Sequence, residues 1–136
     1  MSEPDGHAAE SGAFRQVIEN VAAGITILQD DRIVYANARA AKMLGREVSA
    51  LVGVEAAALL FADERQRPVD SLRALVAGDV DEDYNEYRIA LPDGRGRHIA
   101  VSSTRTDWNG RAAMLCVFHD ISRQRAAMAE IGRAHV

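Results

Sequence analysis

The chain has 136 residues, of which 48% are hydrophobic, and a formal net charge of −4, so it is long enough for one domain around one core. The basic residues are scattered among acidic ones, which excludes the clustered basic face of a nucleic-acid-binding protein, and no apolar run approaches the roughly 18 residues of a membrane span. A single cysteine allows no internal disulfide and the acidic start lacks a signal-peptide pattern, so we expect a cytoplasmic protein.

A leader and an apolar-faced helix come first in chain order. Residues 1–12 lack periodicity, which predicts a disordered leader. Residues 13–23 are predicted to form a cap helix, because apolar residues recur at spacings of three and four. Four residues make up this apolar face, which is expected to cover the sheet and to contribute to a dimer contact: Phe14, Val17, Ile18 and Val21.

A β-hairpin is predicted next. Residues 25–28 and 33–35 are rich in β-branched and aromatic side chains, and the pair Asp30-Asp31 between them favours a tight turn. The two segments are therefore expected to pair as short antiparallel strands.

Several short helices should follow the hairpin. Asn37 directly precedes the alanine-rich stretch 38–44, and Gly45 closes it, which predicts a helix with an asparagine N-cap. We interpret Asn37 as this cap rather than as a ligand donor. Residues 48–52 and 55–61 are expected to add two further helical turns.

The clearest helical pattern covers residues 68–77. Pro68 is expected at the first helical position, an apolar stripe follows it, and Gly78 marks the end. The stripe consists of Val69, Leu72, Leu75 and Val76.

Three long strands are predicted after this helix. Residues 84–91, 97–106 and 111–121 are strand-like, and Asp93-Gly94 and Asn109-Gly110 supply the positive-φ positions of the two hairpin turns. The third strand runs into a helix, residues 122–136, with no flexible linker between them. A change inside the sheet could therefore pass mechanically to whatever follows, which is typical of a sensor rather than of a catalyst.

The exit helix carries a short heptad-like seam. Apolar and polar residues recur there at alternating steps of three and four, over barely two heptads, so a dimer should also rely on the cap helix and the sheet face. The seam residues are Ile121, Gln124, Met128, Ile131 and His135.

The order of elements and several short motifs together resemble a PAS domain. The matching stretches are Gly24-Ile25-Thr26-Ile27, Arg32-Ile33-Val34-Tyr35-Ala36-Asn37-Ala38 with Leu44-Gly45, Leu51-Val52-Gly53, Pro92-Asp93-Gly94-Arg95 and Phe118-His119-Asp120-Ile121-Ser122-Arg123. The last stretch is similar to the family's Asp-Ile-Thr motif at the joint between final strand and signalling helix, with Ser122 in place of threonine. The likeness covers residues 13–131.

This resemblance implies an α+β fold with a five-stranded antiparallel sheet in the order 2-1-5-4-3 and short helices on one face. It also implies a PAS core over residues 24–121. The last strand independently supports two covered faces, because its apolar residues alternate in two sets: Met114, Cys116 and Phe118 in one, and Ala113, Leu115 and Val117 in the other.

Family members hold ligands, if any, in the cavity between helices and sheet. The candidate lining residues here are Ile27, Met43, Leu44, Leu59, Leu60, Leu72, Val76, Tyr87, Ile89, Ile99, Val101, Met114, Cys116 and Phe118. The candidate signal joint is Asp120, Ile121 and Ser122. Asp120 is expected either to cap the exit helix or to pair with a nearby arginine.

Haem and flavin are both disfavoured as cofactors. The 68–77 helix has no histidine, whereas haem-binding relatives usually ligate iron from that helix, and His98 and His119 lie on strands. Cys116 lies in mid-strand, without the flavin photoreceptors' cysteine motif, and Trp108 is expected to make a packing or partner contact. No metal pattern and no nucleophile–base set is present, so no enzyme is expected.

Two functions follow as hypotheses. The first is a sensory module of a bacterial-type signalling protein, which binds a small ligand or a partner, forms a homodimer and signals through the exit helix to an output domain outside this chain. The alternative is a ligand-free dimerisation and protein-interaction module, with a core filled by its own aliphatic side chains.

Overall fold

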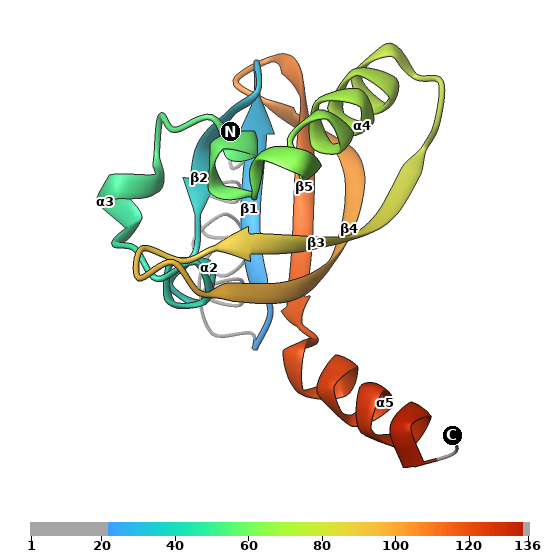
Figure 1. The fold of residues 1–136 in the computed structure, drawn as a ribbon. Coiled ribbons are helices and arrows are strands. Elements are labelled where there is room, and N and C mark those ends of the chain that lie inside the picture. Colours follow the sequence, from blue (N-terminus) through green and yellow to red (C-terminus); the bar gives the residue numbers. More distant parts are fainter. Residues whose placement is uncertain (1–21, 135–136) are drawn as a thin grey trace.

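The computed structural model describes residues 22–134, with the backbone alone at 133 and 134, and contains one antiparallel sheet of five strands (Figure 1). The strands lie in the order β2-β1-β5-β4-β3, as the resemblance implies. Their bounds are β1 Gly24–Gln29, β2 Arg32–Ala36, β3 Glu82–Ala90, β4 Gly96–Trp108 and β5 Arg111–Asp120. The predicted leader and the apolar stripe of the cap helix fall outside the described residues.

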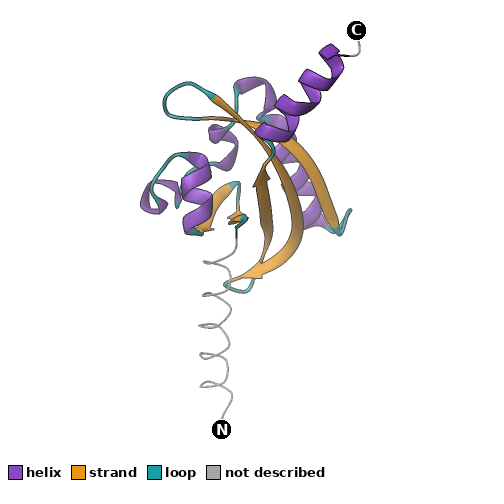
Figure 2. Ribbon diagram, turned by 90° about the horizontal axis from the view of Figure 1, so that it is seen from below, coloured by secondary structure: helices purple, strands orange, loops and turns teal. Residues whose placement is uncertain are grey.

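Short helices connect β2 to β3 and pack against the curved sheet (Figure 2). They are α2 Ala38–Leu44, α3 Val48–Leu51, the 3-10 turns η1 Ala56–Leu59 and η2 Ala62–Glu64, and α4 Gln66–Ala77. The last helix, α5 Ser122–Ala134, follows β5 and projects away from the body of the domain (Figure 1).

Two helix predictions need correction. The helix expected over 55–61 is only the short η1, because Leu60 leaves it to form an isolated β-bridge with Ile89. Pro68 is the third residue of α4 rather than the first. Proline is still tolerated there, because the amides of the first helical turn have no partner inside the helix.

The hairpin turns follow the predicted chemistry. Asp30 and Asp31 have φ values of 54° and 66°, and Asn109 and Gly110 have φ values of 51° and 80°. Two successive positive φ angles match the right-handed twist of the flanking strands, and Asp, Asn and Gly tolerate them best. These turns therefore fix two-residue connections between β1 and β2 and between β4 and β5.

Asn37 is completely buried and joins α2 to β1. Its side-chain oxygen accepts hydrogen bonds from the backbone N–H of Ala40 at 2.8 Å and of Ile25 at 3.0 Å. Its amide group donates to the carbonyl of Ala23 at 3.2 Å. The predicted cap is thus present, and the same side chain also ties the helix to the first strand.

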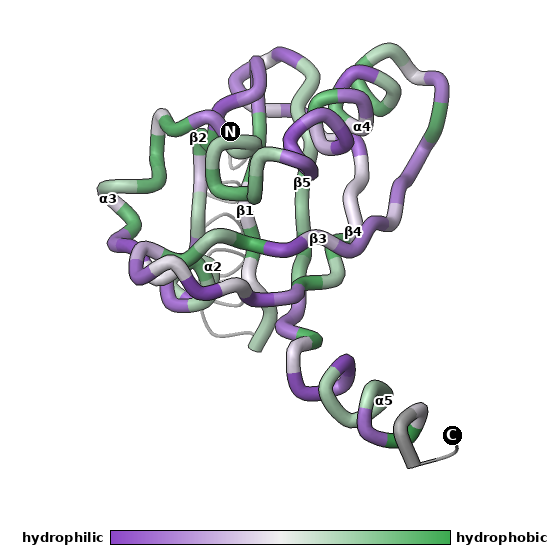
Figure 3. The backbone as a smooth tube through the Cα atoms, viewed as in Figure 1, coloured by the Kyte–Doolittle hydropathy of each residue, from purple (hydrophilic) through white to green (hydrophobic). Residues whose placement is uncertain are grey.

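The core lies between the sheet and the helices. Its centre is formed by β1 and β5, which are hydrophobic over most of their length, whereas α5 alternates between hydrophobic and hydrophilic residues (Figure 3). In the paired register Thr26 lies opposite Cys116, and Ser103 lies opposite Cys116 from the other side. This register decides which residues of each strand face the helices.

Candidate functional site

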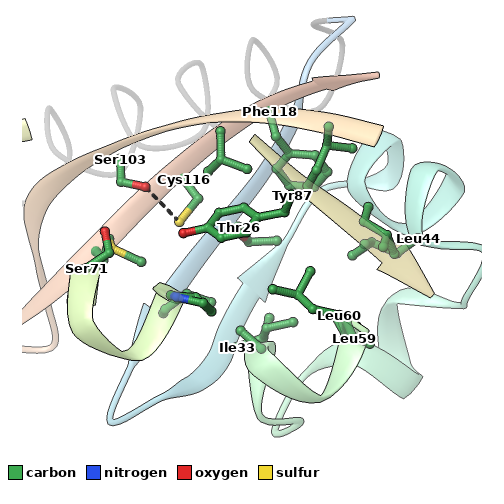
Figure 4. Close-up of a pocket in the computed structure, with 17 residues that line it drawn as sticks. Thr26, Ile33, Leu44, Leu59, Leu60, Ser71, Tyr87, Ser103, Cys116 and Phe118 are labelled. Carbon is green, nitrogen blue, oxygen red and sulfur yellow. Dashed lines mark hydrogen bonds between the residues drawn. The ribbon is translucent and has the colours of Figure 1, made fainter. Parts of the chain in front are cut away.

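A cavity of about 80 Å³ lies in the core between the sheet and the helices (Figure 4). Its walls come from all five strands and from α2, η1 and α4. Ten of the fourteen sequence-predicted residues line it: Leu44, Leu59, Leu60, Tyr87, Ile89, Ile99, Val101, Met114, Cys116 and Phe118.

Four predicted residues do not line this cavity. Ile27 pairs with Leu115 and lies one step out of phase with Thr26 and Leu28, which face the cavity instead. Met43 is buried in the core cluster away from the cavity.

The other two misplaced residues lie on α4. Leu72 is buried beside a smaller void of about 10 Å³, and Val76 is 38% exposed next to a surface groove. The inward face of this helix is centred on Ser71, Leu72 and Leu75, which are all buried. Val76 is therefore displaced toward the edge of the helix, although it belongs to the apolar stripe of the sequence.

Polar side chains that are not among the predicted lining residues complete the wall. Thr26, Ser71 and Ser103 are buried and line the cavity together with Cys116. The Ser103 hydroxyl lies 3.6 Å from the Cys116 sulfur, and Thr26 lies opposite Cys116 in the pairing of β1 with β5. The sequence pattern could have predicted the position of Ser103, because alternate residues of a strand face the same side and Ser103 is on the same side of β4 as Ile99 and Val101.

The two weakly acidic groups of the wall are held neutral by their surroundings. Burial raises the pKa of the Cys116 thiol to about 11, although the hydroxyls of Ser103 and Thr26 act in the opposite direction. Burial likewise raises the pKa of Tyr87 to about 12, against the lowering effect of the Arg67 guanidinium. At neutral pH the cavity wall therefore carries a thiol and a phenol, and no thiolate nucleophile is available.

Arg67 connects α4 to β3 beside the cavity-lining residue Tyr87. Its guanidinium donates to the carbonyl of Glu86 at 3.1 Å and to the side-chain oxygen of Asn85 at 3.0 Å. It also lies over the ring of Tyr87, 4.9 Å from the centroid. One side chain thus fastens the start of the helix to the edge strand beside a cavity-lining residue.

In the predicted signal joint, Asp120 is the last residue of β5 and Ser122 is the first residue of α5. Only Ile121 lies between the strand and the helix. Asp120 meets both expectations: one oxygen accepts from the Ser122 backbone N–H at 2.9 Å, and the other lies 3.2 Å from the Arg97 guanidinium. Ser122 accepts from the His98 backbone N–H at 3.0 Å, and the Ile121 N–H donates to the His98 carbonyl at 2.9 Å. The start of α5 is therefore fastened to the start of β4.

Two arginines extend this joint toward the cavity walls. Arg97 also donates to the carbonyls of Met43 and Lys42 at the end of α2. Arg125 in α5 donates to the carboxylate of Glu86 in β3 at 2.7 Å. Glu86 is the neighbour of Tyr87, so Arg125 connects the exit helix to a strand that lines the cavity, and Arg97 connects the end of α2 to Asp120 at the end of β5.

The described residues offer little to a metal or to haem iron. No group of three or more metal-ligating side chains occurs in the part of the chain that the structure describes, and no histidine of that part lines the cavity. Trp108 packs against Tyr35 with ring centroids 6.3 Å apart, away from the cavity. Across residues 22–134, no helix is both long enough and apolar enough to span a bilayer.

Comparison with known proteins gives a family and a fold. The family model of the PAS fold matches residues 12–121. A PAS domain of an HTR-like protein from Haloarcula marismortui superposes with a TM-score of 0.70 at 20% identity, over 89% of this chain and 100% of that one. No curated protein matches the sequence.

Two further solved structures come from regulatory proteins. The PAS domain of nitrogen regulation protein NR(II) from Vibrio parahaemolyticus matches with a TM-score of 0.60 at 18% identity, over 79% of this chain and 96% of its own. A PAS domain in complex with ethanol, from a LuxR-family transcriptional regulator of Burkholderia thailandensis, matches with a TM-score of 0.67 at 18% identity, over 80% and 97%. At these identities the likeness establishes the fold.

Proposed function

The chain belongs to the PAS family, and from this premise we propose that it is a sensory module that binds a small ligand and relays its presence through α5. The observation that carries the proposal is the joint at Asp120. Strand β5 supplies Met114, Cys116 and Phe118 to the cavity wall and reaches α5 after one intervening residue. A ligand that shifts β5 therefore acts directly on the base of the exit helix.

The relay requires two arrangements of the sheet and the helix. A ligand shifts such an equilibrium only by its difference in affinity for the two states, so a 100-fold preference contributes about 2.7 kcal/mol. A free energy of about 2.7 kcal/mol is enough to break one or two of the contacts that Arg97, Ser122 and Arg125 make at the joint. Each is a single hydrogen bond or a partly exposed ion pair, worth about 0.2–1.5 kcal/mol.

The cavity supports a small ligand rather than haem or flavin. Its volume of about 80 Å³ is well below the roughly 300–1,000 Å³ of pockets for drug-sized molecules. The ethanol complex of the Burkholderia regulator supports this size class, because that PAS domain has the same fold.

Homodimerisation through the exit helix and the cap helix is part of the proposal. Met128 and Ile131 in α5 are 73% and 57% exposed, which is costly in water unless another apolar surface covers them. The same observation favours the second candidate function, a ligand-free interaction module. In that case the cavity is a packing defect and the exposed residues are the functional part.

Mass analysis of the protein purified from cells separates the two functions. A bound small molecule under native conditions supports the sensor, and protein without any bound mass supports the interaction module. For the relay, Asp120→Ala should change the dimer geometry in solution scattering more than it changes ligand affinity. An equal loss of ligand binding would count against the relay.

A further inference from the structure

The chemistry of the cavity wall restricts the ligand more narrowly than its volume does. No Asp, Glu, Lys, Arg or His is among the described residues that line it. Its two weakly acidic groups, on Cys116 and Tyr87, are neutral at physiological pH. A charged ligand would have to leave water without a countercharge in the wall, which is strongly unfavourable.

The charges just outside the wall are already engaged. The Ser71 hydroxyl donates to the Asp83 carboxylate, which also accepts from the Asn85 side chain at 2.7 Å. The Glu64 carboxylate accepts from a β3 backbone N–H, and the Arg67 guanidinium is bound to β3. Near Tyr87 the carboxylates of Asp83 and Glu64 therefore outnumber the single guanidinium of Arg67. An anionic ligand gains no net electrostatic attraction there.

The hydrogen-bonding groups are gathered on one side of the cavity. Figure 4 shows Ser71, Ser103 and Cys116 on one side, and Ile33, Leu44 and Leu60 on the opposite side. The Ser103 hydroxyl can donate or accept a hydrogen bond, and the Ser71 hydroxyl, which donates to Asp83, can still accept one, whereas the apolar side offers only van der Waals contact.

We propose that the cavity binds an uncharged amphiphile of a few non-hydrogen atoms, with one hydroxyl or carbonyl group facing Thr26, Ser103 and Cys116 and a short apolar chain facing Leu44 and Leu60. This inference rests on the proposed function, in that it takes the cavity as the sensing site. A ligand of about five non-hydrogen atoms binds no tighter than about the micromolar range.

Three probes of equal chain length test the proposal: 1-butanol, butyrate and butylammonium, titrated at pH 7 into the ¹⁵N-labelled full chain. Saturable amide shifts at Tyr87, Ser103 and Cys116 are expected with 1-butanol, and at least tenfold weaker binding with either ion. Comparable binding of an ion, or the absence of saturable shifts with 1-butanol, overturns the proposal.

Ser103→Ala tests the orientation, with Ser102→Ala as the matched control because Ser102 is exposed on the other face of β4. Loss of one hydrogen bond should weaken 1-butanol binding about three- to tenfold in Ser103→Ala, and the control should bind as the wild type does. Equal affinity of both variants overturns the assigned orientation.

The amides of α5 are read in the same spectra and report on the relay. Cavity shifts without any response in α5 would refute the relay and leave the ligand class intact. A response of α5 to an ion alone would refute the ligand class and leave the relay.

Discussion

Removal of the Asp120 carboxylate should loosen α5 from the sheet by a predictable amount. In Asp120→Ala the Ser122 N–H loses its acceptor at 2.9 Å, and Arg97 loses a partner at 3.2 Å. Loss of a helix-capping acceptor costs about 1 kcal/mol. The ion pair adds about 0.2–1 kcal/mol, because its two side chains are 29% and 40% exposed and therefore screened by water.

The sum, about 1–2 kcal/mol, corresponds to a factor of about 5–30 in the population in which α5 is detached. Hydrogen exchange measures that population, because the Ile121 N–H donates to the His98 carbonyl across the joint and the Arg125 N–H donates to the Ile121 carbonyl in the first turn of α5. Both amides should exchange about 5–30 times faster in Asp120→Ala. Amides in the centre of β5 should be unaffected.

Two variants serve as controls. Asp120→Asn keeps an acceptor for the Ser122 N–H but lacks the charge, so exchange should rise less than about fivefold. Asp107→Ala removes an exposed aspartate at the far end of β4 and should change neither amide. An increase below twofold in Asp120→Ala, or an equal increase in Asp107→Ala, would refute the assignment of the joint.

Three further outcomes are expected from the structure. Asn37→Ala should lower the free energy of unfolding by about 2–4 kcal/mol in urea denaturation, because it leaves buried backbone groups without partners; a loss below 1 kcal/mol would contradict this. Gly24→Ala should lower the free energy of unfolding by about 1–3 kcal/mol, since its Cβ would lie 2.5 Å from the Phe118 ring. In Gly132→Ala the new Cβ meets no atom within 4 Å, so this variant should stabilise α5 by up to about 1 kcal/mol. Equal effects of the two substitutions in urea denaturation would refute the packing argument. Burial raises the folded-state pKa of Cys116 from 9.0 to about 11, so the neutral thiol contributes fully to the free energy of unfolding below pH 9, and this contribution is lost as pH rises toward 11. Between pH 9 and 11 the stability of Cys116→Ala should therefore fall less steeply than that of the wild type. Identical pH profiles of the two proteins would contradict this.

The local features of the fold could be predicted from particular residues. The Asp30-Asp31 and Asn109-Gly110 turns have the positive φ angles that their chemistry favours. Gly78 ends α4 in the left-handed conformation, and Asn37 caps α2. These features depend on a few neighbouring residues, whose conformational preferences are largely independent of the rest of the chain.

The cavity was predictable only in part. In β5 the two faces could be separated by alternation, and Met114, Cys116 and Phe118 all line the cavity. In β1 residues with high β propensity lie on both faces, so the sequence is compatible with either face turned inward; the prediction places Ile27 in the cavity, whereas Thr26 lines it in the structure.

Length, composition, turn residues and helix caps by themselves indicated one domain of strands and short helices in which a strand runs into a helix, and the resemblance to PAS domains implied the α+β fold. Only the tertiary structure decided which side of β1 faces the helices, that Ser71 rather than Val76 faces the cavity, that Arg125 connects α5 to β3, and that Arg97 connects Asp120 to the end of α2. The reason is physical: turns and caps are short-range preferences, whereas strand register, helix rotation and ion pairs between distant segments are set when the whole core packs at once.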